Sequence, residues 1–129
     1  MLPPDHIRRG AIDPNAQLEI VQETPASVHL DAHFAFGPIA ATQAVRLASA
    51  KAQEVGIGCV GLGNSNDIGR LGGYLQQPAA AGLVAVMLVN DAGSGPWVAP
   101  WGGTQPFLST NPIAAAIPWQ PDLPIVIDI

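Results

Sequence analysis

Residues 38–62, PIAATQAVRLASAKAQEVGIGCVGL, decide the fold class of this 129-residue chain. Pro38 is typical of a first helical turn, and Gly56 ends the helical pattern. The apolar run 57–62 predicts a short buried strand. A helix followed by a buried strand is the alternation of an α/β fold. The predicted helix, residues 38–55, has its apolar side chains on one stripe that should pack closely on a sheet: Ala41, Ala44, Val45, Ala48, Ala52 and Val55.

Further elements are predicted on both sides of this stretch. Residues 17–22 and 26–31 alternate polar and apolar side chains and predict a hairpin, with a turn at Thr24-Pro25. A second helix is predicted over 68–81, kinked or shortened by Pro78. Together with strands at 83–89, 113–117 and 124–128, these elements predict one mixed sheet with two helices packed on it.

Composition excludes several classes of function. The net charge of −5 argues against binding nucleic-acid phosphates. Hydrophobic residues make up 48% and charged residues only 12%, so we expect further chain or a partner to cover some apolar surface. The apolar run 82–89 is too short to span a bilayer. Prolines interrupt the start and no signal peptide is predicted, so a cytoplasmic protein is expected.

The cysteine and histidines do not predict a metal site. Cys59, the single cysteine, lies in an apolar run and is expected to be a buried thiol. The three histidines have no metal-ligand spacing with a cysteine or a carboxylate cluster.

Three polar loops are candidate ligand sites. Residues 63–69 follow a buried strand, where α/β sheets bind ligands. Within them, Asp67 would cap a helix that begins at Ile68. The loop 90–95 also follows a strand. In residues 100–114, Gly102-Gly103 permits a sharp turn, and Asn111 before Pro112 forms a stiffened corner. A proline-rich surface turn between two strands remains the structural alternative.

Together these segments resemble the type-2 malate/L-lactate dehydrogenase family, which includes ureidoglycolate, diketogulonate, sulfolactate and piperideine-carboxylate enzymes. Residues 56–69 with Gly73-Tyr74 are similar to the family's strand ending in Asn-Ser-Asn-His-Phe-Gly. Residues 98–103 resemble its Pro-x-Gly-Gly turn. Residues 109–114 and 125–129 are similar to its Gly-Thr-Asn-Pro-Ile-Ala corner and the start of its Asp-Met-Ala strand.

The resemblance implies an α/β (α+β) fold of non-Rossmann type and a homodimer. It implies hydride transfer between NAD or NADP and a small 2-hydroxy or 2-oxo acid, or a cyclic imine. That chemistry needs a nicotinamide, a proton-transfer group and a cation for the substrate carboxylate. When the family's site residues are carried over by position, the resemblance implies cofactor contacts at Thr110, Asn111, Pro112 and Asp128. It implies substrate contacts at Asp91 and Ser94.

Asp67 departs from the family because it occupies the position of the acid/base histidine. Carboxylates are ordinarily ionised at neutral pH, so an aspartate is a poor proton donor there. Ser109 also replaces the usual glycine.

The family's N-terminal Ser-His-Gly region with its arginine, and its C-terminal half, are not matched. We therefore expect residues 1–129 to be a single domain, the central portion of such an oxidoreductase, incomplete or inactive as it stands. The alternative is a non-catalytic relative that acts as an interaction or structural domain.

Overall fold

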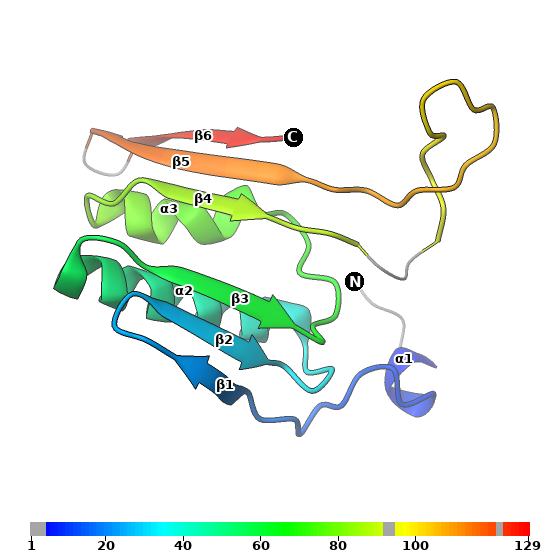
Figure 1. The fold of residues 1–129 in the computed structure, drawn as a ribbon, viewed down its shortest axis with the longest axis horizontal. Helices are drawn as coiled ribbons and strands as arrows, with labels where there is room; N and C mark the ends of the chain where they lie inside the picture. The colour runs from blue at the N-terminus through cyan, green and yellow to red at the C-terminus, as the bar shows by residue number, and fades with distance from the viewer. Residues whose placement is uncertain (1–4, 92–94, 121–122) are drawn as a thin grey trace. The chain divides into compact units, whose positions relative to one another are not determined.

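The computed structural model describes residues 5–91, 95–120 and 123–129. Its contacts divide the chain into two compact units, Met1–Arg70 and Leu71–Ile129. Each unit holds one three-stranded sheet (Figure 1). The predicted mixed α/β fold is confirmed, but the strands form two sheets instead of one. That the 129 residues form a single domain stays a prediction.

The first unit is a hairpin followed by a helical crossover. The sheet order is β1-β2-β3, with β1 antiparallel and β3 parallel to β2. The predicted hairpin is confirmed, with an irregularity between Ile20 and Gln22. A parallel pair needs a long crossover, and α2 supplies it. The elements are α1 (Asp5–Arg8), β1 (Glu19–Glu23), β2 (Ser27–Asp31), α2 (Gly37–Val55) and β3 (Cys59–Gly63).

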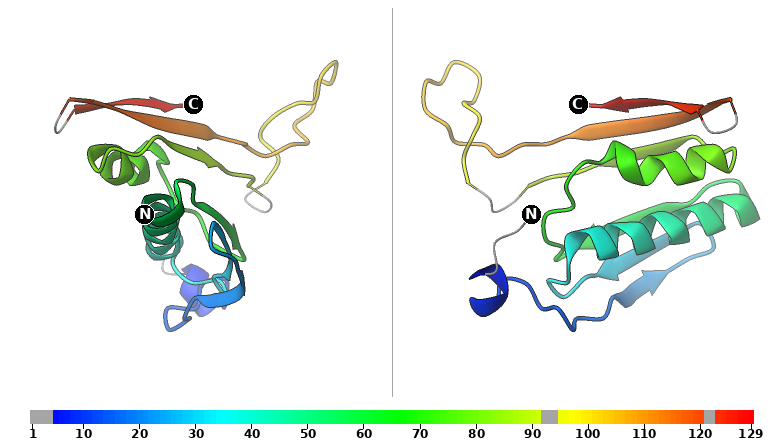
Figure 2. Two further views of the ribbon diagram at one scale, coloured as in Figure 1. Left: turned by 60° about the vertical axis from the view of Figure 1, so that its left-hand side comes forward. Right: turned by 180° about the vertical axis from the view of Figure 1, so that it is seen from behind.

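Helix α2 packs through the small side chains of the predicted stripe. Ala41, Ala44 and Val45 are buried, and Ala44 joins Val28 and Leu30 of β2 in the core. In Figure 2, α2 lies along one face of this sheet. Val55, at the end of the stripe, is 46% exposed, because the helix stops there. Gly56 ends it as predicted, in the left-handed conformation with a φ of 89°.

Cys59 contradicts the prediction of a buried thiol, because its side chain is exposed. Successive strand residues face opposite sides of a sheet. Val60 and Leu62 pack against the core beside α2, so Cys59 and Gly61 lie on the other face of β3. An apolar run identifies a strand but does not identify its covered face.

The second unit is an antiparallel sheet with one helix. The sheet order is β4-β5-β6. Helix α3 contacts all three strands and buries Leu75 and Ala79. Beneath it, Ala114 and Ala116 of β5 are fully buried. The elements are α3 (Gly72–Ala80), β4 (Ala85–Leu88), β5 (Ile113–Gln120) and β6 (Leu123–Asp128).

The start of α3 differs from the prediction. The helix begins at Gly72 instead of Ile68, because Gly69 takes a φ of 68° that no right-handed helix permits. Asp67 therefore does not cap it. Asp128 Oδ2 accepts a hydrogen bond from the Gly72 N–H at 2.9 Å, so the cap comes from the end of β6. Pro78 lies inside this short helix, as predicted.

This arrangement predicts that substitutions of two aspartates differ in their effect on stability. Asp128→Ala should lower the free energy of unfolding by about 1 kcal/mol, because the first-turn N–H loses a half-buried acceptor. Asp67→Ala is the matched control and should change it by less than half as much. Urea unfolding followed by circular dichroism measures both. An equal loss in the two variants would contradict the cap at Asp128.

Candidate active site

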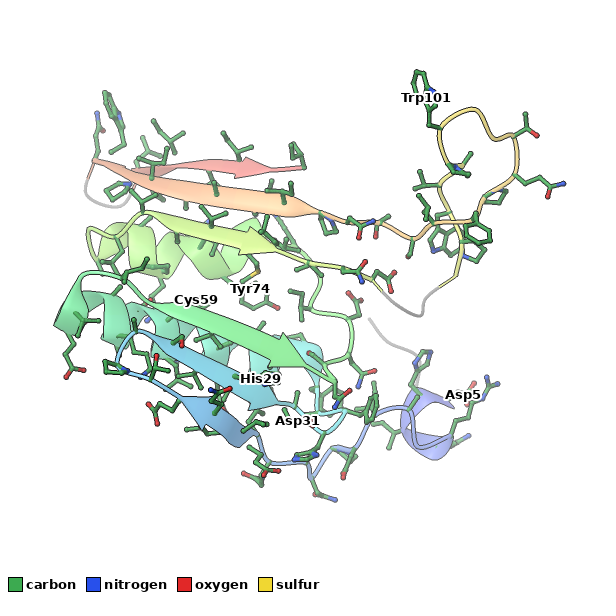
Figure 3. The ribbon with its side chains drawn as sticks, in the orientation of Figure 1. Asp5, His29, Asp31, Cys59, Tyr74 and Trp101 are labelled. Carbon is green, nitrogen blue, oxygen red and sulfur yellow. The ribbon has the colours of Figure 1, made fainter. Side chains whose placement is uncertain are left out.

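In the first unit, a polar network joins the carboxyl ends of the parallel strands β2 and β3. Asp31, at the end of β2, accepts a hydrogen bond from the His33 backbone N–H at 2.7 Å. Its other oxygen accepts one from Asn64 Nδ2 at 2.8 Å. Figure 3 shows Asp31 at this edge of the sheet. The carboxylate thereby ties together the two loops that follow these strands.

Asn66 and Gly37 hold the segment that leads to Asp67. Asn66 Nδ2 donates to the carbonyl oxygens of Phe34 at 2.8 Å and Ala35 at 3.2 Å. A Cβ at Gly37 would overlap the carbonyl oxygens of Asn66 and Asp67, so only glycine allows this approach to the start of α2. Sequence reasoning missed the roles of Asp31 and Asn66, although the Asn-Ser-Asn run after a strand was the available sign.

Asp67 itself is exposed and makes a local turn. Its Oδ1 accepts a hydrogen bond from the Gly69 N–H at 2.9 Å. This is an Asx turn of the kind that aspartate commonly forms in loops. A catalytic role for Asp67 stays a prediction.

The spacing Gly56-x-Gly58-x-x-Gly61 matches a dinucleotide-binding pattern but has the wrong context. That pattern binds phosphates where a strand ends and a helix begins. Here the three glycines lead out of α2 and into β3. They therefore provide no phosphate site of the Rossmann kind.

In the second unit, the corner at residues 109–112 is bound to the end of β4. Ser109 Oγ donates to Asp91 Oδ2 at 2.6 Å, and the Asp91 N–H donates to the Thr110 carbonyl at 3.2 Å. The Val89 N–H donates to the Pro112 carbonyl at 3.1 Å. The structure thus brings Asp91 together with the predicted cofactor corner. Sequence reasoning missed Ser109 as the residue that makes this link.

The corner presents polar groups at the surface. Thr110 and Asn111 are exposed, whereas Pro112 is half-buried. Asn111 Nδ2 donates to the Ser109 carbonyl at 3.2 Å, which fixes the plane of the amide. Asp128 is different, because its Oδ2 bonds to the start of α3. Ser94, the other predicted substrate residue, lies outside the described residues.

Charge limits what this corner can hold. Residues 71–129 contain no lysine, arginine or histidine. A substrate carboxylate needs a cation or several strong donors to replace its water. Asp91 has the wrong charge for that task, although it can accept a hydrogen bond from a hydroxyl. A cation for a carboxylate at this corner would therefore have to come from outside residues 71–129.

The described residues limit two other functions. They contain no group of three or more His, Cys, Asp or Glu side chains placed to hold a metal ion. None of the helices in the described ranges has the length and apolar character needed to cross a lipid bilayer.

The hydrogen bonds to Asp31 predict how substitutions of its neighbours change the pKa of its carboxyl group. The His33 backbone N–H and then the Asn64 amide hold the pKa of Asp31 below its ordinary value. His33→Gly keeps the backbone N–H that donates to Asp31, so the pKa of Asp31 should remain below its ordinary value. Asn64→Gly keeps the positive φ of 50° but removes the amide, so the pKa should rise. Carbon-13 NMR of the carboxyl group measures both variants.

The sign of the pH effect follows from the lowered pKa. The ionised carboxylate stabilises the fold fully above about pH 4, and this stabilisation is lost as the pH falls through the folded pKa. A larger shift in His33→Gly than in Asn64→Gly would contradict the assigned cause.

Comparisons with known proteins place the chain among dehydrogenases. The malate/L-lactate dehydrogenase family matches residues 4–129. Hydroxycarboxylate dehydrogenase B of Escherichia coli O157:H7 is 39% identical over 128 residues, which are 97% of this chain and 35% of that protein. The chain spans about a third of the length of the curated relatives it matches.

Solved structures with a similar fold support the same family. Malate dehydrogenase from Pyrococcus horikoshii OT3 superposes with a TM-score of 0.88 at 34% identity, covering 97% of this chain and 35% of that one. The delta1-piperideine-2-carboxylate reductase from Pseudomonas syringae gives 0.82 at 32% identity, covering 95% and 36%. Because the family match extends over nearly the whole sequence and the fold follows it, the chain belongs to the malate/L-lactate dehydrogenase family.

Proposed function

We propose that this chain is the nicotinamide-binding portion of an NAD(P)-dependent oxidoreductase. The proposed reaction interconverts small 2-hydroxy and 2-oxo acids, or reduces a cyclic imine, in a homodimeric enzyme. The observation that carries the proposal is the corner 109–112, held against Asp91 in a chain of this family. The named activities of hydroxycarboxylate dehydrogenase B and the piperideine-carboxylate reductase support the same substrate classes.

The corner fits a nicotinamide carboxamide. That group carries one carbonyl and one NH₂, so it needs both donors and acceptors. The Thr110 hydroxyl and the Asn111 amide offer both from exposed positions beside the rigid Pro112. The cofactor, when bound, supplies the hydride that the reduction needs. The task of Thr110 and Asn111 is to orient its ring.

We further propose that the chain has no turnover as it stands. The proton-transfer position holds Asp67, which is exposed and bonded within its own turn. The corner has no cation of its own between residues 71 and 129. Both features affect the substrate. Without a cation its carboxylate has no charged partner, and without a suitable acid/base its hydroxyl proton has no group to transfer to.

The first test is therefore a direct assay. We expect no measurable oxidation or reduction of malate, lactate, ureidoglycolate or cyclic imino acids with either nicotinamide cofactor. Absorbance at the reduced-nicotinamide band measures the rate. Turnover by the purified chain would contradict the proposed inactivity.

A chimera isolates the effect of Asp67. The unmatched N- and C-terminal regions of hydroxycarboxylate dehydrogenase B are joined to this chain, and Asp67 is compared with Asp67→His. We expect the histidine form to be faster by ~100- to 10,000-fold, the usual contribution of a general acid or base. Equal rates would show that Asp67 is itself a working acid/base.

The second candidate function is that of a non-catalytic relative that serves as an interaction or structural domain. Asp67 at the histidine position is the observation that favours it. This candidate predicts that the folded Asp67→His chimera stays inactive, although the grafted relative is active. The two functions are thereby separated.

A further inference from the structure

Asp91 is bonded to the corner at residues 109–112 through both its backbone and its side chain. Its N–H donates to the Thr110 carbonyl at 3.2 Å, and its Oδ2 accepts a hydrogen bond from Ser109 Oγ at 2.6 Å. Figure 1 shows that the segments that follow β4 and precede β5 run alongside each other here. Ser109 comes immediately before Thr110 and Asn111 in the sequence. The carboxylate therefore lies beside the corner that we propose for the nicotinamide.

Asp91 brings a localised negative charge to this corner. Its bond of 2.6 Å from Ser109 Oγ falls in the range of about 2.5–2.7 Å that hydroxyl groups show toward ionised carboxylates. Asp91 is the one charged residue in the stretch 89–121. Both Asp91 and Ser109 are half-buried. Partial burial lowers the effective dielectric constant around the carboxylate, so salt and water screen its charge less than they screen a fully solvated one.

A negative charge at this place distinguishes the two redox states of a nicotinamide. The oxidised ring is a pyridinium that carries a formal positive charge, whereas the reduced ring is neutral. The sugars, the pyrophosphate and the adenine are the same in both states. A carboxylate beside the ring therefore attracts the oxidised form and has little effect on the reduced form. Thr110 and Asn111 are uncharged hydrogen-bonding groups, so they do not make this distinction.

We propose that Asp91 is a specificity-determining residue that favours the oxidised nicotinamide cofactor over the reduced one. The inference rests on the proposed function, because it requires the ring of the cofactor at the corner. It gives Asp91 a role toward the cofactor, whereas the family resemblance implies a substrate contact there. By linkage, tighter binding of the oxidised form makes a bound reduced cofactor a stronger hydride donor, which favours reduction of the substrate.

The sign of this contribution does not depend on the other charges around the corner. Asp91→Asn removes one negative charge and keeps a side-chain oxygen that can accept the hydrogen bond from Ser109. Any other charged group that acts on the cofactor stays in place, so the change in preference reports on Asp91. At a separation of several ångströms, and with an effective dielectric constant between those of a protein surface and water, one charge changes an affinity by about three- to tenfold.

Titrations of the purified chain with NAD⁺ and with NADH test the proposal. Nitrogen-15 NMR follows the amides of Thr110 and Asn111 and gives a Kd for each cofactor without any turnover. The measured quantity is the Kd for NADH divided by the Kd for NAD⁺. We expect Asp91→Asn to lower this ratio by about three- to tenfold. The matched control Ser109→Ala removes the hydrogen bond but keeps the charge, so it should leave the ratio nearly unchanged, even where both affinities fall together.

A second variant should change the ratio in the opposite direction. Asn90→Asp adds a carboxylate at the adjacent, exposed residue, so it should raise the ratio. The amide spectrum without cofactor shows whether each variant is folded. If Asp91→Asn does not fold, a ratio that fails to rise in Asn90→Asp overturns the proposal.

The outcomes separate this inference from the proposed function. If both cofactors shift the corner amides but Asp91→Asn leaves the ratio unchanged, the role given to Asp91 is wrong and the cofactor site stands. An equal fall of the ratio in Ser109→Ala would also overturn it, because the hydrogen bond and not the charge would then be the cause. If neither cofactor shifts the corner amides, the proposed cofactor site is itself wrong, and the inference about Asp91 fails with it.

Discussion

Small side chains between each helix and its sheet are the constraint on which both units depend. In the first unit, Ala40 and Ala44 on the buried side of α2 are small, and a Cβ at Gly58 would overlap the carbonyl oxygen of Ala48. In the second unit, Ala114 and Ala116 are fully buried beneath α3. Helix and strand backbones approach closely because little side-chain volume separates them. Larger side chains at these positions would force the layers apart or strain them.

This close packing also arranges the site. Gly37 lets the segment before Asp67 approach the start of α2, and Asn66 then reaches the carbonyl oxygens of the facing loop. In the second unit, α3 begins close enough to β6 for Asp128 to accept from its first N–H. The same contacts that build the fold therefore fix the loops at the carboxyl ends of β2 and β3 and the start of α3.

Much of the fold could be predicted because its signals are local. The alanine stripe identifies α2, and the alternation before it identifies the β1–β2 hairpin. The predictions that were wrong concern features set by residues that are distant in the sequence. Asp67 was expected to cap the second helix, but the positive φ of Gly69 delays that helix and Asp128 supplies its acceptor. Cys59 was expected to be buried, but periodicity alone cannot tell which face of a strand a helix covers.

The candidate site also has one part that the sequence predicts locally and another part that depends on contacts between distant residues. The Thr110–Pro112 corner is visible in the sequence because proline and asparagine fix it locally. The bond from Ser109 to Asp91 joins residues 18 positions apart and needed the structure. The family likeness supports a nicotinamide as the ligand proposed for the corner. Residues 71–129 have no lysine, arginine or histidine, so the proposed substrate carboxylate would need a cation from elsewhere.

The proposed function requires that this corner binds a nicotinamide even though the chain has no turnover as it stands. The most direct measurement is a nitrogen-15 NMR titration of the purified chain with NADH and NADPH. We predict shifts confined to the amides of Thr110 and Asn111 and their neighbours, and loss of those shifts in Asn111→Ala. Shifts that are absent from the corner, or that persist unchanged in Asn111→Ala, would contradict the claim.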